Sequence, residues 1–542
     1  MKKVYYNGEI ITVNDEQPVA DAILIEDGKI VAVGEWENMQ HDIDDATEKI
    51  DLQHNVVLPG FIDGHGHVGN PAASVVRLDP PPNGDIDSKE KLIQHLKKAF
   101  DDQRILENGW FVAMGYDNVF FENRSHPTKD DLDQVSKETP ILILHASGGH
   151  MGVVNSKALE IVGWDEHTEN PEGGVIQRDP ITGALNGILE EKAVKYVAFN
   201  YVLKNLGMES LGKMFENTQK YYASKGVTTA QEGGTISKAL LQMLQYCQQT
   251  DRLMMDVGVY PLQENISEVI PDQSEAQQYV KHLKICGAKV VGDGSPQAKT
   301  AWLTAPYYVK PENTEEGYRG YSVYSDEKMF AFCKQALEHD WQILVHCNGD
   351  AMADQFIRSY RQAQQETGNT KNLRPVMIHA QTVREDQLDA MKELGIMPSF
   401  FNDHVFYWGD YYVESILGPE RAQRISPLAS AVKRGMPFTL HNDMPVTPVN
   451  PILNIHNAVN RTTRSGQVLG KEYCVDVMEA IKAVTIYGAY QYFDEQIKGS
   501  LEEGKLADMV ILDKNPLHVP KEAIKDIRVL ETIKEGNTIY KA

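Results

Sequence analysis

Between residues 58 and 443 the sequence alternates short apolar runs with longer amphipathic segments, and this alternation constrains the fold more than any other feature. Short runs rich in Val, Ile, Leu and Phe are typical of buried parallel strands, whereas a 3.6-residue period is typical of helices. The runs are 58–62, 226–231, 254–260, 288–291, 341–346, 375–379, 396–401 and 437–443. Eight strands that alternate with helices can close into a barrel, so we predict the α/β class and a (β/α)8 TIM-like barrel.

The two ends of the chain read as β-structure without helices. Asp27-Gly28 and Asn7-Gly8 are typical of two-residue hairpin turns between short apolar runs, and Gly536-Asn537 separates two more runs near the C-terminus. Because isolated hairpins are marginally stable in water, we expect the two ends to pair into one small β-sandwich.

These patterns give the expected domain organisation. Residues 1–57 and 493–542 form the composite β-sandwich, and residues 58–492 form the barrel. The stretch after the first barrel strand is too long for a single crossover connection, so we expect residues 70–211 to be an inserted subdomain within the barrel.

Composition limits the classes of partner. The 542 residues carry a formal net charge of −24, which argues against nucleic acid or an anionic membrane as a partner. Five scattered cysteines without a Cys-x-x-Cys pair are typical of free thiols in a reducing compartment. The N-terminus lacks the apolar region of a signal peptide, and no run approaches the ~20 apolar residues of a membrane span. We therefore expect a cytoplasmic enzyme with a small-molecule substrate, and leave assembly into a homo-oligomer open.

Two histidines one residue apart follow the first predicted strand. Side chains at i and i+2 of a strand point to the same face, so His65 and His67 can converge on one metal ion while Gly66 leaves the space between them clear. The alternative is two unrelated polar residues in a glycine-rich turn, since His-x-His is a common pattern.

The later strands supply partners for this pair. Polar side chains lie on the predicted strands, mostly at or just past their C-terminal ends, where β/α barrels build their sites. The set is His65, His67, Lys289, His346, His379 and Asp443. Taken singly, each histidine could be a hydrogen-bonded rim residue and Asp443 a turn residue. Six such residues around one barrel favour a shared site, although Lys289 fits less well because its strand continues to Val291.

Several segments carry a family resemblance. The run Pro59-Gly60-Phe61-Ile62-Asp63-x-His65-x-His67 resembles the signature of the amidohydrolase superfamily, in the YtcJ-like, amidohydrolase family 3 branch that includes N-substituted formamide deformylases. The resemblance covers essentially the whole chain. Further similar segments are Gly149-His150 with Asn155-Ser156-Lys157-Ala158-Leu159, Gly187–Glu191, Lys289 with Asp293-Gly294-Ser295, His346 with Gly349-Asp350, His379-Ala380-Gln381, Asp443-x-Pro445 and Gly504-Lys505-x-Ala507-Asp508.

The resemblance implies a metal centre and a reaction. Imidazole and carboxylate ligands suit Zn²⁺, so one or two divalent ions are expected on His65, His67, Lys289, His346, His379 and Asp443. By resemblance, Lys289 is carbamylated to N6-carboxylysine and bridges the ions; the alternative is an ordinary amine paired with Asp293 or Asp443. Metal-bound hydroxide attacks an amide-type carbonyl, Asp443 is the general acid/base, and His150 helps to stabilise the oxyanion.

The chain also departs from the family pattern. The family usually has Ser or Thr before Asp443, where this chain has His441-Asn442, and we expect His441 to support a ligand instead of binding metal itself. The expected function is hydrolysis of non-peptide C–N bonds. The alternatives are hydrolysis of another carbonyl or a phosphorus ester at the same site, or a non-catalytic amidohydrolase-like interaction protein.

Overall fold

The computed structural model describes residues 2–70, 74–81, 84–122, 124–146, 151–204, 206–235, 238–263, 266, 278–311 and 314–542. The chain divides into two compact units. The first comprises Met1–Gly66, Gln219–Asn442 and Asn450–Ala542. The second comprises His67–Thr218 and Asp443–Val449, and the range 70–211 expected as an insertion lies within the first of these stretches.

The first unit contains the parallel strands predicted from the central apolar runs. Among the described residues these are β6 (Phe61–Ile62), β13 (Val227–Thr235), β14 (Asp256–Pro261), β16 (Gly287–Val291), β17 (Gln342–Cys347), β18 (Val376–His379), β19 (Met397–Phe400) and β20 (Thr439–Leu440). Two parallel sheets hold them, β6-β13-β14-β15 and β16-β17-β18-β19-β20, where β15 (Leu283–Ile285) directly precedes β16. The isolated bridge between Leu262 and Lys289 joins the two sheets, so the strands follow one another in chain order.

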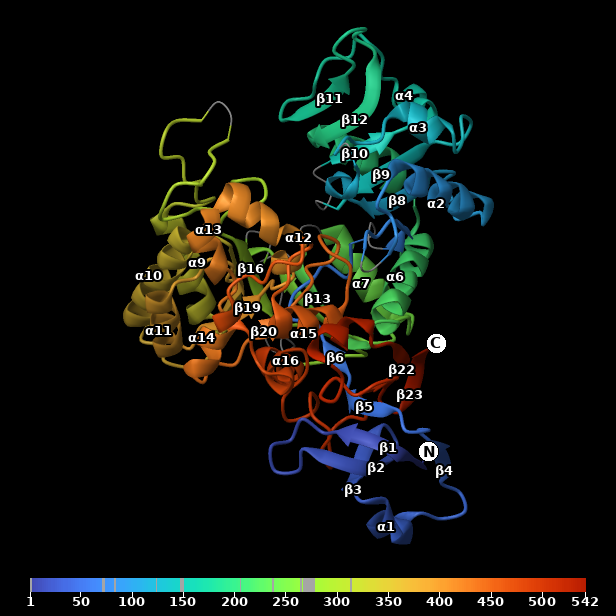
Figure 1. The fold of residues 1–542 in the computed structure, drawn as a ribbon, viewed down its shortest axis with the longest axis vertical. Helices are drawn as coiled ribbons and strands as arrows, with labels where there is room; N and C mark the ends of the chain where they lie inside the picture. The colour runs from blue at the N-terminus through green and yellow to red at the C-terminus, as the bar shows by residue number, and fades with distance from the viewer. Residues whose placement is uncertain are drawn as a thin grey trace. The chain divides into compact units, whose positions relative to one another are not determined.

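The remaining gap of this ring, between β20 and β6, is spanned by a buried side chain. Gln491 accepts a hydrogen bond from Thr439 Oγ1 at 2.7 Å and donates one to the carbonyl of Gly64 at 2.7 Å. The chain order of these parallel strands agrees with the predicted (β/α)8 barrel, whose closure by strand pairing between β20 and β6 stays a prediction. Helices of the unit include α1 (Trp36–Met39), α7 (Lys238–Gln249), α9 (Asp326–Glu338), α10 (Asp350–Thr367), α11 (Glu385–Leu394), α12 (His404–Tyr411), α13 (Gly418–Arg421), α14 (Leu428–Lys433), α15 (Pro451–Asn460), α16 (Val477–Ala483) and α17 (Ile486–Gln491) (Figure 1).

The two chain ends pair in one sheet of the first unit. Its strands are β1 (Lys2–Ile11), β2 (Val19–Glu26), β3 (Lys29–Gly34), β4 (Glu48–Asp51), β5 (Val56–Pro59), β21 (Met509–Leu512), β22 (Val529–Lys534) and β23 (Asn537–Lys541). The order is β23-β22-β21-β5-β1-β2-β3, with β4 on β1 (Figure 1). Pairing between the ends is therefore confirmed, whereas their packing as a two-layered sandwich stays a prediction.

One of the predicted turns in this sheet is wrong. Asp27 and Gly28 do form the tight turn between β2 and β3, because Glu26 pairs with Lys29. Asn7 and Gly8 instead lie inside β1, where the register with β2 shifts between Tyr6 and Ile10. This irregularity is a bulge, which uses the same left-handed conformation as a hairpin turn: Asn7 has φ +59°.

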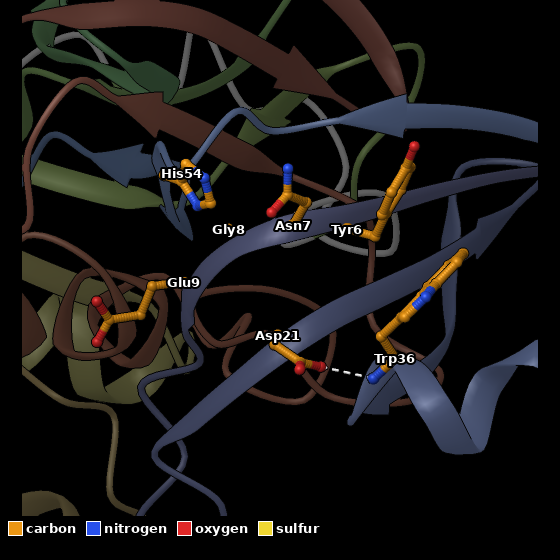
Figure 2. A pocket seen from close by; sticks show the side chains of 7 residues that line it. All are labelled: Tyr6, Asn7, Gly8, Glu9, Asp21, Trp36 and His54. Carbon is orange, nitrogen blue, oxygen red and sulfur yellow. Dashed lines mark hydrogen bonds between the residues drawn. The ribbon is translucent and has the colours of Figure 1, made fainter.

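A surface pocket of the terminal sheet lies beside this bulge (Figure 2). Tyr6 and Trp36 stack on each other there, with ring centroids 4.5 Å apart. Asp21 Oδ1 accepts a hydrogen bond from the Trp36 backbone N–H at 2.6 Å, and Asn7 Nδ2 donates to Asp51 Oδ1 at 2.7 Å. These groups bind one another, so we assign the pocket a role in the packing of the sheet.

The second unit has a sheet of its own. Its order is β11-β12-β10-β9-β8-β7, built from β7 (Val76–Arg77), β8 (Phe111–Tyr116), β9 (Ile141–His145), β10 (Met151–Val154), β11 (Gly174–Arg178) and β12 (Leu185–Glu191). Helices α2 (Lys89–Asp101), α3 (Lys129–Asp133), α4 (Ser156–Val162) and α5 (Lys192–Val197) accompany it. Across the described parts of both units, helices long and apolar enough for a bilayer crossing are absent.

Candidate metal centre

Three predicted ligands come together at the C-terminal ends of the barrel strands. His346 lies next to the last residue of β17, His379 ends β18, and His65 follows β6 by three residues. His379 Nε2 is 3.1 Å from His346 Nδ1, and His65 and His379 have ligand nitrogens within 4.8 Å of each other. Lys289, on β16, places Nζ 2.9 Å from His65 Nε2. Four residues that are far apart in the sequence therefore form one group, in which His346 is partly exposed and the other three are buried.

Each imidazole of this group is held through one nitrogen and presents the other. His65 Nδ1 lies 2.6 Å from Gln231 Oε1, and His346 Nε2 lies 3.0 Å from Asn348 Nδ2 and 3.3 Å from the carbonyl of Gly294. His379 Nδ1 lies 3.1 Å from His441 Nε2. Metal-binding histidines are usually oriented in this way, because a hydrogen bond at one ring nitrogen fixes the tautomer and leaves the other nitrogen free to bind the ion.

Two glycines make room for the His65 ring and its loop. A Cβ on Gly233 would lie 2.4 Å from both Cε1 and Nδ1 of His65, so only glycine fits beside the imidazole. A Cβ on Gly66 would lie 2.7 Å from Asp63 Oδ2. The small residue between the two histidines is thus required by close packing within its own loop.

Backbone strain is found at another of the ligands. His379 has φ +73° and the next residue, Ala380, has φ +44°, although neither is glycine. Non-glycine residues in the left-handed region cost of order 1–3 kcal/mol and cluster at functional sites. The strain is consistent with a backbone conformation at the end of β18 that orients the His379 imidazole.

The electrostatic environment keeps His379 neutral. Burial lowers the pKa of His379 well below its usual value, and the nearby His346, His441, His65 and Lys289 lower it further. A neutral imidazole has a lone pair on one nitrogen, which is the form that binds a metal. Three imidazole nitrogens directed at one another beside a buried amine are a donor set that fits a borderline ion such as Zn²⁺.

The other two predicted ligands belong to the second unit. His67 Nε2 lies 3.4 Å from Asp443 Oδ1, and the His67 backbone N–H donates to the carbonyl of Met444 at 2.9 Å. Asp443 is 8% exposed and has φ +53°. The predicted oxyanion residue His150 lies outside the described residues.

A network of amide side chains holds the chain that leads into Asp443. Asp403 accepts hydrogen bonds from Asn442 Nδ2 and Asn457 Nδ2, both at 2.7 Å. Burial raises the pKa of Asp403 to about 7. Asn454 Nδ2 donates to the carbonyl of His441 at 3.3 Å. The end of β20 is therefore tied to α12 and α15 immediately before the predicted acid/base residue.

Sequence reasoning missed most of the residues that orient the imidazoles. Gln231 is the last residue of a predicted strand, as His346 and His379 are. This position is the feature of the sequence that could have indicated its place near the imidazoles. Ser399, whose Oγ lies 2.8 Å from His441 Nδ1, has no such signal, because a serine within a strand is commonplace. His441 was noticed only as a departure from the family pattern.

Comparisons with known proteins point to one family. The family model described as amidohydrolase family matches residues 48–540. The chain is 25% identical to the putative amidohydrolase YtcJ of Bacillus subtilis, over 100% of this chain and 99% of that protein. It is 23% identical to an N-substituted formamide deformylase of Arthrobacter pascens, over 98% of this chain and 97% of that protein.

Solved structures support the fold. The crystal structure of an uncharacterized metal-dependent hydrolase from Pyrococcus horikoshii OT3 superposes with a TM-score of 0.74 at 24% identity. The match covers 96% of this chain and 99% of that one. At this level of identity, the likeness concerns the architecture of the chain.

Proposed function

Because this chain belongs to the amidohydrolase family, we propose that it is a metal-dependent hydrolase of C–N bonds in amides outside peptide chains. The observation that carries the proposal is the convergence of His65, His346 and His379 beside Lys289. His65 Nε2 lies 2.9 Å from Lys289 Nζ, and His379 Nε2 lies 3.1 Å from His346 Nδ1. The name of the Arthrobacter pascens relative supports amide-type substrates such as N-substituted formamides.

The proposed ligand set extends beyond these four residues. His67 follows His65 by two positions, and Asp443 follows His441 by two, so chain connectivity keeps both close to residues of the imidazole group. We include them as ligands, with Lys289 as a carbamylated N6-carboxylysine. Zn²⁺ is the expected ion because imidazole nitrogen and carboxylate oxygen are its preferred ligands.

The protein's own groups then have distinct roles. A divalent ion bound here would polarise a substrate carbonyl and lower the pKa of water toward about 7. Asp443 takes a proton from the attacking water at its carboxylate and passes it to the departing amine. Gln231, His441 and the Gly294 carbonyl keep the imidazoles in one orientation, and His150 is proposed as a donor to the oxyanion.

The proposal is tested by metal analysis together with activity. Purified protein should contain one or two divalent ions per chain by elemental analysis, and the metal-loaded protein should hydrolyse members of a panel of N-formyl, N-acyl and cyclic amides. Carboxylic and phosphorus esters form the comparison panel. Protein prepared without chelators that contains no divalent ion would refute the metal centre, and turnover of esters alone would refute the bond type.

A substitution separates the acid/base role from folding. Asp443→Asn should retain most of the metal and lose turnover by about 10²- to 10⁴-fold, the usual contribution of a general acid/base. Asp389→Asn changes an exposed carboxylate that pairs with Arg434 and serves as the matched control. Near-normal turnover by Asp443→Asn would remove this residue from the mechanism.

A further inference from the structure

A hydrogen-bonded chain of three buried side chains runs from the centre of β19 to the His379 ligand. Ser399 Oγ lies 2.8 Å from His441 Nδ1, and His441 Nε2 lies 3.1 Å from His379 Nδ1. Ser399 and His441 are both 0% exposed, and His379 is 2% exposed. With solvent excluded from the chain, the position of each proton is set by its neighbours.

The chain has two internally consistent proton arrangements, because a neutral imidazole has one N–H donor and one acceptor nitrogen. In the first arrangement, His379 Nδ1–H donates to His441 Nε2, and His441 Nδ1–H donates to Ser399 Oγ. In the second, Ser399 O–H donates to His441 Nδ1, and His441 Nε2–H donates to His379 Nδ1. Only the first leaves His379 Nε2 without a proton and able to bind a metal.

His379 differs in this respect from His65. The partner of His65 Nδ1 is the side-chain oxygen of Gln231, which only accepts hydrogen bonds, so Nδ1 of His65 carries the proton. His346 Nε2 lies 3.3 Å from the carbonyl of Gly294 and 3.0 Å from Asn348 Nδ2. The imidazole partner of His379 can act as donor or as acceptor, so its own state decides which nitrogen of His379 carries the proton.

The His441 ring is held firmly enough to exert this control. Its ring stands edge-on to that of His65, with centroids 5.4 Å apart and planes at 90°, and its backbone carbonyl accepts from Asn454 Nδ2. The Phe401 ring covers it at 5.2 Å. Rotation of the His441 ring away from His379 would disturb its contacts with the His65 and Phe401 rings, while the bond from Asn454 holds the backbone at this position.

We propose that His441 is a positioning residue that sets the tautomer of His379, and through it the metal affinity of the centre. The inference rests on the proposed metal centre but not on any substrate. His441, which departs from the family pattern two residues before Asp443, thereby has a specific role. Ser399 Oγ accepts the hydrogen bond at the end of the chain.

The test compares Zn²⁺ affinity among apoprotein variants, measured by competition with a chromophoric chelator. His441→Asn keeps a polar group near Ser399 but is too short to reach His379, so Zn²⁺ affinity should fall by about 10- to 100-fold. His441→Gln places an amide oxygen near the position of Nε2 and should recover most of the wild-type affinity. His456→Asn, at a buried histidine on α15 that bonds to Asn460, is the matched control and should bind as wild type does.

The outcomes distinguish this inference from the proposed function. Equal Zn²⁺ affinity for wild type and His441→Asn would overturn it, as would a His441→Gln variant as weak as His441→Asn at an unchanged melting temperature. Wild-type protein that binds Zn²⁺ tightly but hydrolyses no amide would refute the proposed function and leave the inference standing. A melting temperature of each apoprotein shows whether a loss of affinity reflects unfolding.

Discussion

Replacement of Gln231 by leucine separates orientation of a ligand from general stability. Gln231 is fully buried on β13, and its oxygen accepts from His65 Nδ1 at 2.6 Å. Its amide nitrogen donates to the carbonyl of Gly64 at 3.0 Å and to the hydroxyl of Tyr492 at 2.8 Å. Leucine has a similar volume, so the substitution removes three hydrogen bonds and leaves no large cavity.

The expected loss of stability follows from what the partners retain. A buried hydrogen bond contributes about 1 kcal/mol net, so three lost bonds amount to about 3 kcal/mol. The Gly64 carbonyl still accepts from Gln491 Nε2, and the Tyr492 hydroxyl still donates to the carbonyl of Asp63. Since two of the three partners keep a second bond, we expect the free energy of unfolding to fall by about 2 kcal/mol.

The loss of metal affinity should exceed what instability explains. Without its partner, the ring of His65 can rotate or change tautomer, and loss of such a contact typically lowers metal affinity about 10- to 100-fold. Gln355→Leu is the matched control, because Gln355 is 2% exposed and also makes three hydrogen bonds. Its partners are Ser322 Oγ, the Tyr324 carbonyl and Asp326 Oδ1.

The assay is urea unfolding of the apoproteins, followed by Zn²⁺ titration against a chelator. Both glutamine variants should lose a similar free energy of unfolding, and only Gln231→Leu should lose Zn²⁺ affinity. The reasoning would be refuted if Gln231→Leu bound Zn²⁺ as tightly as Gln355→Leu, since Gln231 would then have a purely structural role.

Two further predictions concern close packing and pH. Gly233→Ala should lower Zn²⁺ affinity by about 10-fold or more, because its Cβ would lie 2.4 Å from the His65 ring. Gly207→Ala is the control: its Cβ would meet nothing within 4 Å, so the Zn²⁺ affinity should not change. Burial lowers the pKa of His456 from 6.5 to about 4, so its pKa in the folded protein lies below its pKa in the unfolded chain. The stability that His456 contributes is present above pH 6.5 and is lost as the pH falls through 4. When the pH is lowered from 7 to 4.5, the free energy of unfolding of wild type, measured with urea, should therefore fall by about 2 kcal/mol more than that of His456→Gln. Equal decreases would contradict the lowered pKa of His456.

The parallel strands and the imidazole group were predictable because their signals are local. Each strand is a short apolar run, and a ligand at its C-terminal end is recognisable without knowledge of the partner strand. In a parallel barrel all such ends meet at one face, so residues as distant as His65 and His379 can be grouped from strand order alone. The structure places these side chains next to one another: Lys289 Nζ lies 2.9 Å from His65 Nε2, and His379 Nε2 lies 3.1 Å from His346 Nδ1.

The bulge in β1 could not be predicted, because its sequence signal is ambiguous. Asn-Gly suits a hairpin turn and a bulge equally, since both need the left-handed conformation that Asn7 adopts. What decides between them is the neighbouring chain: a Cβ on Gly8 would lie 2.5 Å from the carbonyl oxygen of Asn55. That approach depends on strand pairing across nearly fifty residues of sequence.

The residues that orient the ligands were hidden for a related reason. Gln231 lies 166 positions from His65, and Ser399 lies 42 positions from His441. Each contact exists only in one register of adjacent or facing strands, and a one-residue slip would turn the side chain to the other face. A polar residue within a strand therefore gives no indication of which imidazole it serves.

A second group of potential ligands shows why geometry alone does not identify a metal centre. Asp256, His282 and Glu535 also place ligand atoms within 4.8 Å of one another. However, Asp256 forms buried ion pairs with both Lys498 and Lys534, so its charge is already neutralised by two ammonium groups. A cation placed there would be repelled by both lysines, whereas burial keeps the His379 imidazole neutral.

The position of this ionic group gives it a different task. Asp256 is the first residue of β14, at the N-terminal end of a barrel strand. In β/α barrels, residues at this end contribute to stability, whereas catalytic residues lie at the opposite end. Lys534, on β22 of the terminal sheet, binds both Asp256 and Asp508 at 2.9 Å and is 3% exposed. Removal of one partner of a buried pair costs about 3–5 kcal/mol. The charges at this end thus attach the terminal sheet to the barrel, while the neutral imidazoles at the opposite strand ends remain available for a metal.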